Sequence, residues 1–321
     1  MSDNNHAIVP VGQRGVVVAV TRQITITEKL LKRIVRWHEH SVELEELKDW
    51  QNLLDWCRRW TKSEPKNYLA WHRLGDAFMY LPGYDEAVDA YRQSIRIDPE
   101  HTEAWTNLGR AYCILKRYDE AVDAYSQAIR IDPEDAFAWT DLGDTYDNLK
   151  RYNEAIDAYQ QAIRIDPEWV YAWKNLGDTY CILKRYDEAV DAYRQAIRID
   201  PEDAFAWTDL GNTYYGLDRY DEAIDAYRQA IRINPEYANA WNNIGVACKS
   251  LKYYNEAIDA YQQAIRINPE YAIAWNNLGK TYYSLKRYDE AIDVTEKLQR
   301  LNSEMANDLS NIIFHAKQQR E

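Results

Sequence analysis

Tryptophan recurs along this chain at a fixed interval of 34 residues, and this period constrains the fold more than any other feature of the sequence. The recurring residues are Trp71, Trp105, Trp139, Trp173, Trp207, Trp241 and Trp275. Two segments that lie two periods apart, 111–143 and 179–211, differ only at Ala111/Thr179 and Ser126/Arg194. A period of this length is typical of repeat architectures, in which each unit packs on its neighbours.

Other positions are nearly constant when each unit is counted so that this Trp is its fourth residue. The eighth residue is Gly, the twentieth is Ala, the twenty-fourth is Tyr until Thr295, and the thirty-second is Pro from Pro99 to Pro269. Positions 4, 7, 8 and 11 fall on one face of a helix, and positions 20, 24, 27 and 28 fall on one face of a second helix. Proline separates successive units because it cannot continue a helix. Each unit is therefore predicted to be a hairpin of helices A and B, which approach closely at the Gly and the Ala.

The pattern W-x2-L-G-x2-Y, A-x3-Y, P resembles the tetratricopeptide repeat (TPR) family over residues 68–301. The predicted fold class is all-α. The resemblance implies a right-handed α-solenoid of tandem helical hairpins, whose A helices line a concave groove that binds a peptide or a partner protein.

The period also predicts the domain organisation. The seven regular units are residues 68–101, 102–135, 136–169, 170–203, 204–237, 238–271 and 272–301. Residues 34–67 keep the register with drifted residues and are predicted to be a degenerate unit, whereas 302–321 are predicted to be a capping helix. Residues 1–33 do not fit the period: they contain two β-prone runs, and a capping box at Thr25–Glu28 predicts a helix that starts near residue 26. This leader either packs on the first hairpin or attaches the chain to another one.

Composition excludes several classes of function. The formal net charge of −13 disfavours binding to nucleic acid and to anionic membranes. No apolar run approaches the roughly 20 residues of a membrane span, and the four cysteines lack CxxC spacing. We therefore expect a cytoplasmic protein with free thiols, no cofactor and no metal. His38 and His40 stand two residues apart and would point to different faces of a helix.

Residues that vary where the repeat scaffold does not need them are the candidate binding residues. The TPR resemblance implies that positions 2, 5, 6, 9, 12 and 13 of helix A face the groove. The resulting candidates are Asn107, Arg110, Asp141, Asp144, Asp147, Lys174, Asn175, Asp178, Asp209, Asn212, Tyr215, Asn242, Asn243, Lys249, Asn276, Asn277, Lys280 and Tyr283. They are acidic in the middle of the array and rich in amides and lysines towards its C-terminal end, which suits a polar peptide.

Position 6 carries asparagine or aspartate in every unit from the second to the seventh. The series resembles the asparagine ladder with which the TPR region of O-GlcNAc transferase holds peptide backbones, since an amide both donates and accepts hydrogen bonds. The alternative is that Asn before Leu-Gly is simply common in TPR units. A chaperone-type carboxylate clamp fits less well, because Thr208 stands where that clamp needs a lysine.

These patterns predict a non-catalytic scaffold or adaptor for protein–protein interaction. No arrangement of a nucleophile with a base indicates an enzyme, and a binding surface gains more from repetition than a catalytic site does. Two alternatives stay open: a self-assembling structural array, and the regulatory subunit of a separately encoded enzyme. The partner and the oligomeric state are left undetermined.

Overall fold

The computed structural model describes residues 34–318, and this part of the chain contains helices and no strand. The fold is an all-α solenoid of tandem helical hairpins, as the period predicts. It divides into two compact units, the first ending at Glu134 and the second beginning at Asp135. The β-prone runs and the helix start near residue 26 lie outside the described residues.

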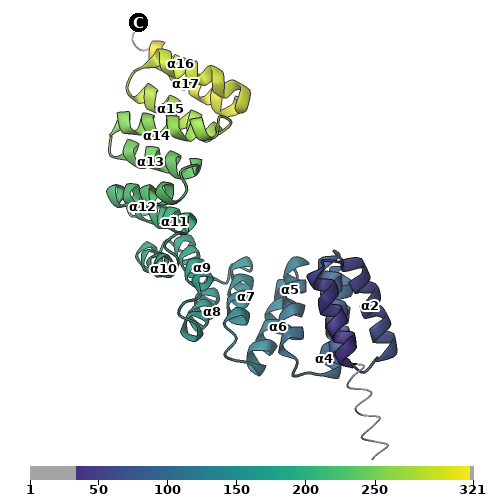
Figure 1. Cartoon of the computed structure of the whole chain (residues 1–321). Helices are drawn as coiled ribbons and strands as arrows, with labels where there is room; N and C mark the ends of the chain where they lie inside the picture. Colours follow the sequence, from purple (N-terminus) through teal and green to yellow (C-terminus); the bar gives the residue numbers. More distant parts are fainter. Residues whose placement is uncertain (1–33, 319–321) are drawn as a thin grey trace, which may run out of the picture. The chain divides into compact units, whose positions relative to one another are not determined.

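Each regular repeat contains one A helix of 13 residues and one B helix of 14 residues (Figure 1). The A helices are α3 (Tyr68–Tyr80), α5 (Thr102–Ile114), α7 (Ala136–Asn148), α9 (Val170–Ile182), α11 (Ala204–Gly216), α13 (Ala238–Ser250) and α15 (Ala272–Ser284). The B helices are α4 (Tyr84–Ile97), α6 (Tyr118–Ile131), α8 (Tyr152–Ile165), α10 (Tyr186–Ile199), α12 (Tyr220–Ile233), α14 (Tyr254–Ile267) and α16 (Tyr288–Leu301).

The first unit starts with helical residues 34–46 and α2 (Trp50–Ser63), which pack through tryptophans. The centre of the Trp37 ring lies 4.4 Å from that of Trp56, and the ring stacks on Trp60 with 6.2 Å between centres. The Trp56 indole also donates to the Trp37 carbonyl at 3.0 Å. Large aromatic surfaces thus replace the Gly and Ala contacts of the regular repeats.

Within a regular hairpin, the glycine of helix A makes room for the tyrosine ring of helix B. A Cβ built on Gly143 would lie 2.5 Å from the Tyr159 ring, and Gly211 has the same relation to Tyr227. Both rings are buried, with 1% and 2% of their surface exposed. The sequence predicted a close approach at this glycine, and the group that approaches it is an aromatic side chain.

The turn between helices A and B uses a left-handed residue at position 15. Lys150 adopts φ 59°, and the same conformation recurs at Lys184 and Asp218. The Arg151 amide then donates back to the Tyr146 carbonyl at 2.8 Å, so the end of helix A keeps its carbonyls bonded. This turn geometry returns helix B along helix A in the regular repeats from the second onward, whereas the first has Pro82 at position 15 and lacks the left-handed residue.

Successive repeats are joined by the tryptophan that sets the period. The Trp173 indole donates to the Pro167 carbonyl at 3.0 Å, and Trp207 donates to Pro201 at the same distance. Each B helix of the second unit packs on the next A helix, as α8 does on α9. The A helices also contact one another, α7 with α9 and α13 with α15, so they form one continuous face.

Helix α17 (Ser303–Gln318) covers the last repeat by packing on α15 and α16. Thr295 replaces the usual tyrosine there, and the Leu309 side chain takes the place of the ring, 2.5 Å from where a Cβ on Gly279 would lie. Leu309 is fully buried. The terminal helix therefore completes the core of a repeat that lacks its own aromatic residue.

Candidate functional site

The TPR resemblance predicts which positions of α7, α9, α11, α13 and α15 face a groove, and we call the surface formed by these positions in the second unit the A face. It carries most of the residues that the sequence singled out: Asp141, Asp144, Asp147, Lys174, Asn175, Asp178, Asp209, Asn212, Tyr215, Asn242, Asn243, Lys249, Asn276, Asn277, Lys280 and Tyr283. Asn107 and Arg110 lie on α5 in the first unit.

A three-residue hydrogen-bond relay links neighbouring repeats on the A face. The Tyr159 hydroxyl and the Asn175 amide both donate to Asp144 Oδ1, each at 2.7 Å. Tyr159 is at position 24 and Asp144 at position 9 of one repeat, and Asn175 is at position 6 of the next. The relay thus fixes the packing of α9 against the hairpin that precedes it.

The same relay recurs elsewhere with different residues at position 9. In the second unit, Asn212 Oδ1 accepts from the Tyr227 hydroxyl at 2.9 Å and from the Asn243 amide at 3.0 Å. In the first unit, Asp76 Oδ1 accepts from Tyr91 and Asn107. The position-6 amides therefore use their NH2 groups to connect repeats. The side-chain carbonyl of Asn175 is left as a group that a peptide could contact, whereas that of Asn243 also accepts from the Asn242 amide at 3.2 Å.

Four carboxylates gather on α7, α9 and α11, and we call them the acidic zone: Asp144, Asp147, Asp178 and Asp209. Burial raises the pKa of Asp209 to about 6, and the negative charge of Asp178 adds to the effect. Burial likewise raises the pKa values of Asp144 and Asp147, with neighbouring aspartates adding to the shift.

Hydrogen bonds compensate part of this cost. Asp147 Oδ2 accepts from Thr179 at 2.7 Å and from Tyr159 at 3.1 Å, whereas its Oδ1 is buried without a hydrogen-bond partner among the described residues. The Tyr193 hydroxyl donates to Asp178, which stays exposed. In the acidic zone, the ionised form of the carboxyl groups is therefore energetically unfavourable.

Two lysines form the opposite arrangement further along the A face, and we call Lys249 and Lys280 the basic zone. Burial lowers the pKa of Lys249, and the nearby positive charge of Lys280 lowers it further. Polar groups of the same helices bond to one another: the Tyr215 hydroxyl contacts Ser250 Oγ at 3.2 Å, and the Asn277 amide donates to Asn242 at 3.0 Å.

Lys174, which the sequence placed in the groove, is already paired. Its Nζ lies 2.7 Å from Asp203 Oδ2, and Asp203 also caps the N-terminus of α11 by accepting from the Phe205 and Ala206 amides. Lys174 therefore holds two repeats together, and its charge offsets only part of the burial that raises the pKa values of Asp178 and Asp209.

Three side chains of the first unit could hold a metal ion. His72, His101 and Glu103 each place one ligand atom within 4.8 Å of the others, and two imidazole nitrogens, His72 Nδ1 and His101 Nε2, are buried without a hydrogen bond. Ligands on a tetrahedral zinc ion lie about 3.3 Å apart, given its bonds of about 2.0–2.1 Å. The group would therefore hold zinc only after the side chains had moved closer.

Comparison with protein-family models identifies the repeats. Tetratricopeptide repeat models match residues 72–136 and 136–168, and a model of the C-terminal domain of cilia and flagella-associated protein 70 matches 168–313. The chain is a tetratricopeptide repeat protein. A model of the protein prenyltransferase alpha subunit repeat also matches residues 50–81 of this TPR protein, at the first hairpins.

Solved structures with the same fold include other TPR proteins. A C-terminal part of a TPR protein from Cytophaga hutchinsonii is 16% identical, with a TM-score of 0.66 over 74% of this chain and 98% of the other. MamA is 26% identical, with a TM-score of 0.51 over 54% and 94%. YrrB, a TPR protein with an unusual peptide-binding site, is 22% identical, with a TM-score of 0.51 over 58% and 96%. A search of curated proteins gave no match.

The TPR positions explain what sequence reasoning missed. The spacing predicts only that tyrosine at position 24 lies on the apolar face of helix B, yet its hydroxyl anchors the relay through position 9. The signal was present in the sequence, because Asp or Asn stands at position 9 before Asn107, Asn175 and Asn243, whereas Asn277 follows Val246 and bonds to Asn242 instead. Within residues 34–318, no helix of this TPR protein is both long enough and apolar enough to span a bilayer.

Proposed function

We propose that this TPR protein is a non-catalytic interaction scaffold whose A face binds an extended peptide from a partner protein. The observation that carries the proposal is the crowding of like charges in two separate zones of one face. The pKa of Asp209 is raised in the acidic zone and the pKa of Lys249 is lowered in the basic zone, so folding alone gains nothing from either arrangement. Local arrangements that destabilise the fold, such as crowded like charges with shifted pKa values, are common at binding sites.

The two zones indicate the chemistry of the peptide. A lysine or arginine of the partner would relieve the repulsion between Asp178 and Asp209, since an opposite charge within about 4–6 Å favours the ionised carboxylate. An acidic side chain or a C-terminal carboxylate would do the same between Lys249 and Lys280. We therefore expect a peptide with basic residues in its middle and a negative group at one end.

The position-6 amides supply contacts that do not depend on the peptide's sequence. Their NH2 groups bond to the preceding repeat, as Asn175 does to Asp144. We expect the side-chain carbonyl of Asn175 to accept a backbone N–H group of a peptide. The carbonyl of Asn243 already accepts from the Asn242 amide at 3.2 Å and would use its second lone pair. Each such bond contributes about 0.5–1.5 kcal/mol net, so affinity must come from repetition along the face.

The relatives favour this class of function. YrrB is described as having a peptide-binding site, and its similarity to this chain supports a shared fold. TPR folds are typically non-catalytic, which agrees with the interaction role that we propose. Asn107 and Arg110 belong to the first unit, and their part in binding stays a prediction.

A labelled peptide with two central lysines and a free C-terminal carboxylate tests the proposal by fluorescence anisotropy. Replacing Asp178 and Asp209 together by Asn should weaken binding about three- to tenfold, as expected for two partly exposed ion pairs. Amidation of the peptide's C-terminus should weaken it as well if the negative group meets the basic zone.

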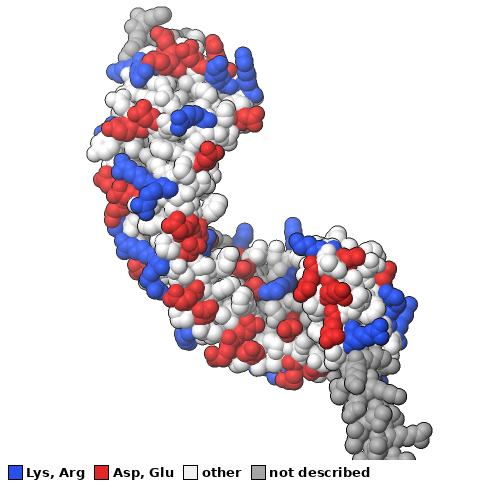
Figure 2. Space-filling model, in the orientation of Figure 1, with Lys and Arg blue, Asp and Glu red and all other residues white. Residues whose placement is uncertain are grey.

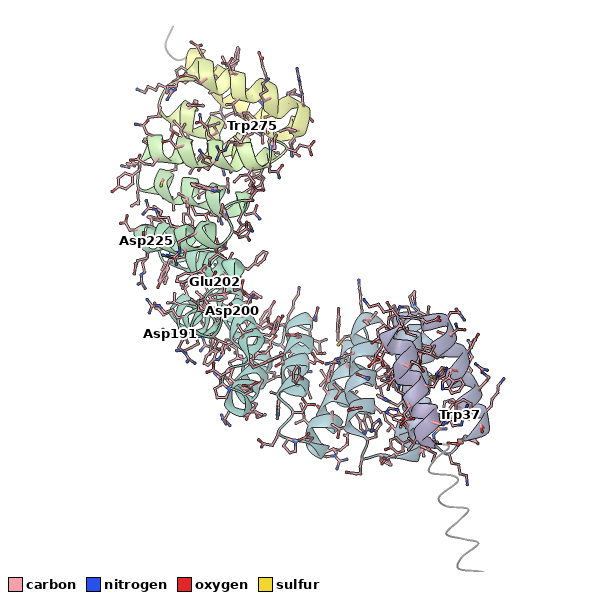
Figure 3. The ribbon with its side chains drawn as sticks, in the orientation of Figure 1. Trp37, Asp191, Asp200, Glu202, Asp225 and Trp275 are labelled. Carbon is pink, nitrogen blue, oxygen red and sulfur yellow. The ribbon has the colours of Figure 1, made fainter. Side chains whose placement is uncertain are left out.

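The matched control changes the same number of charges on the B helices. Asp157 and Asp191 are exposed on α8 and α10, and Figure 3 labels Asp191. Asp157→Asn/Asp191→Asn should leave the affinity unchanged. Equal binding by both double variants and the unchanged chain would refute the proposal, and equal weakening by both would reduce it to general electrostatic attraction.

A further inference from the structure

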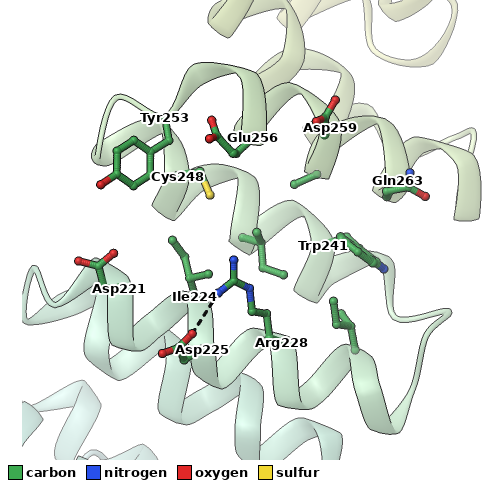
Figure 4. Close-up of a pocket in the computed structure, with 13 residues that line it drawn as sticks. Asp221, Ile224, Asp225, Arg228, Trp241, Cys248, Tyr253, Glu256, Asp259 and Gln263 are labelled. Atoms are coloured by element: carbon green, nitrogen blue, oxygen red, sulfur yellow. Dashed lines mark hydrogen bonds and ion pairs between the residues drawn. The ribbon is translucent and has the colours of Figure 1, made fainter.

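Grooves between neighbouring B helices recur in the second unit at equivalent repeat positions. The groove between α10 and α12 has a volume of about 380 Å³, and the one between α14 and α16 has about 370 Å³. The groove between α12 and α14, with α13 as its floor, has about 800 Å³ (Figure 4). One groove is thus twice as large as its equivalents on the same scaffold.

The enlargement follows from one side chain at position 11. Tyr214 and Tyr282 line the two smaller grooves, whereas Cys248 occupies the same position in the large one. Cys248 is the one residue of the seven at this position that is not aromatic. The volume of a tyrosine ring is therefore missing from the floor of the groove.

A second replacement in the same repeat removes a cation. In the flanking repeats, Arg219 lies 4.6 Å from the centre of the Tyr214 ring and pairs with Glu222, and Arg287 has the same relation to Tyr282. The equivalent of this arginine is Tyr253, while the glutamate is retained as Glu256. Both the ring and the guanidinium of the usual Tyr–Arg–Glu group are absent, and only the carboxylate remains.

The large groove combines an apolar floor with an acidic rim. Ile224, Trp241 and Ile244 line its depth. Asp225 is paired with Arg228 at 3.2 Å, as the dashed line in Figure 4 marks. Asp221, Glu256 and Asp259 also line it, and no ion pair holds these three carboxylates in the described part of the chain. In the view of Figure 2, acidic and basic side chains lie close together on the surface of this unit.

We propose that the groove between α12 and α14 is a second binding site, which accepts from a partner polypeptide an aromatic side chain together with an adjacent arginine or lysine. The aromatic ring fills the space that tyrosine occupies in the other repeats, above Cys248. The cation pairs with Glu256, as Arg219 pairs with Glu222. The partner thus supplies the two groups that this repeat lacks. The site lies on the B helices and does not depend on the peptide that we propose for the A face.

The dipeptide N-acetyl-tyrosyl-arginine amide is a suitable probe, followed by NMR at the Trp241 indole N–H. It should bind the full chain in the millimolar range and more tightly than N-acetyl-alanyl-arginine amide, because burying the ring supplies about tenfold in affinity. Equal shifts with both dipeptides would overturn the proposal.

Filling the groove from within provides the main test. Cys248→Tyr/Tyr253→Arg restores the residues of the neighbouring repeats, so this variant should fold at least as stably and should lose about tenfold or more in affinity for the tyrosyl-arginine probe. Unchanged binding by this variant would also overturn the proposal.

A milder variant keeps the test independent of core packing. Glu256→Gln should lower affinity for the tyrosyl-arginine probe about two- to fivefold, as expected for an exposed ion pair, and should leave binding of N-acetyl-tyrosyl-glutamine amide unchanged. Glu290→Gln is the matched control, because Glu290 is the equivalent glutamate in the groove that contains Tyr282 and Arg287. This change should alter the affinity for neither dipeptide. If Glu256→Gln lowers neither affinity, or lowers both equally, the proposed role of Glu256 is wrong.

Discussion

Asp209 is a residue that the fold tolerates at a cost. The neighbouring repeats carry Asn175 and Asn243 at the same position, and each donates an amide to the repeat before it. Asp209 instead presents a second carboxylate to Asp178, and its pKa of about 6 in the folded chain lies above the ordinary value of 3.8. A carboxyl group with a raised folded-state pKa destabilises the fold at neutral pH and stops doing so as the pH falls from about 6 towards 4.

Asp209→Asn should therefore stabilise the chain at pH 7, by on the order of 1 kcal/mol, because it removes a carboxylate whose charge is unfavourable in the fold. The gain should shrink when unfolding is measured at pH 4, where Asp209 of the unchanged chain is protonated in the fold. Urea titrations followed by circular dichroism at both pH values check this. A gain of the same size at both pH values would show that the carboxylate repulsion is not its source.

Asn175 illustrates the opposite case, because its amide connects two repeats. Asn175→Ala removes a donor to Asp144, a partly buried carboxylate, and should lower the free energy of unfolding by about 1–2 kcal/mol. Asn276→Ala is the control, since the described structure gives the Asn276 side chain no hydrogen bond. Equal melting temperatures for the Asn175 variant and the unchanged chain would mean that the relay does not contribute to stability.

The helices themselves were predictable because each depends on local spacing. Trp, Gly, Ala, Tyr and Pro at fixed positions determine where a helix begins, which face it buries and where it ends, and these features repeat with the sequence. The relay through Asp144 and the groove above Cys248 depend instead on how one hairpin rotates against the next. Sequence spacing does not specify that rotation, so it does not indicate that Cys248 and Tyr253 line the same groove.

The contact between helices A and B is tested at Gly143. A methyl group there would lie 2.5 Å from the Tyr159 ring, so Gly143→Ala should force the ring to move and should cost about 1–3 kcal/mol. At Gly216 the nearest atom to an added Cβ lies 3.1 Å away on the Tyr186 side chain, and Gly216→Ala should change stability much less. Thermal melting of the two variants side by side checks the difference, and equal losses would contradict the packing described here.

The capping helix is tested at Leu309, which fills the last repeat in place of a tyrosine. Leu309 is fully buried against Gly279, so Leu309→Ala should cost about 2–5 kcal/mol in local stability. Because repeats interact mainly with their neighbours, the loss should appear first as faster amide exchange in α15–α17. Uniformly faster exchange throughout the second unit would show that the repeats unfold more cooperatively than interactions between nearest neighbours predict.

At the scale of the whole molecule, the order of charges along the chain could be predicted, and their energetic state could not. The sequence places aspartates in the middle of the array and lysines towards its end. It does not reveal that Lys174 is already occupied by Asp203, or that Lys249 is crowded by Lys280. Those facts depend on burial and on contacts between repeats. They show that each zone holds like charges whose repulsion an opposite charge from a partner would relieve.

Because both zones lie in the unit that begins at Asp135, that unit should bind the lysine-containing peptide without the rest of the chain. A fragment of residues 135–321 keeps α7 to α17, and each of its repeats keeps at least one neighbour, which is what stability in a repeat array requires. Its affinity for the peptide should lie within about twofold of the full chain, a difference well below 1 kcal/mol. A fragment of residues 1–134, which lacks the acidic and basic zones, should bind at least tenfold more weakly, since the proposed contacts are absent. If the shorter fragment binds as well as the full chain while 135–321, folded by circular dichroism, does not, the peptide site belongs to the first unit and the A face of the second is not the binding surface.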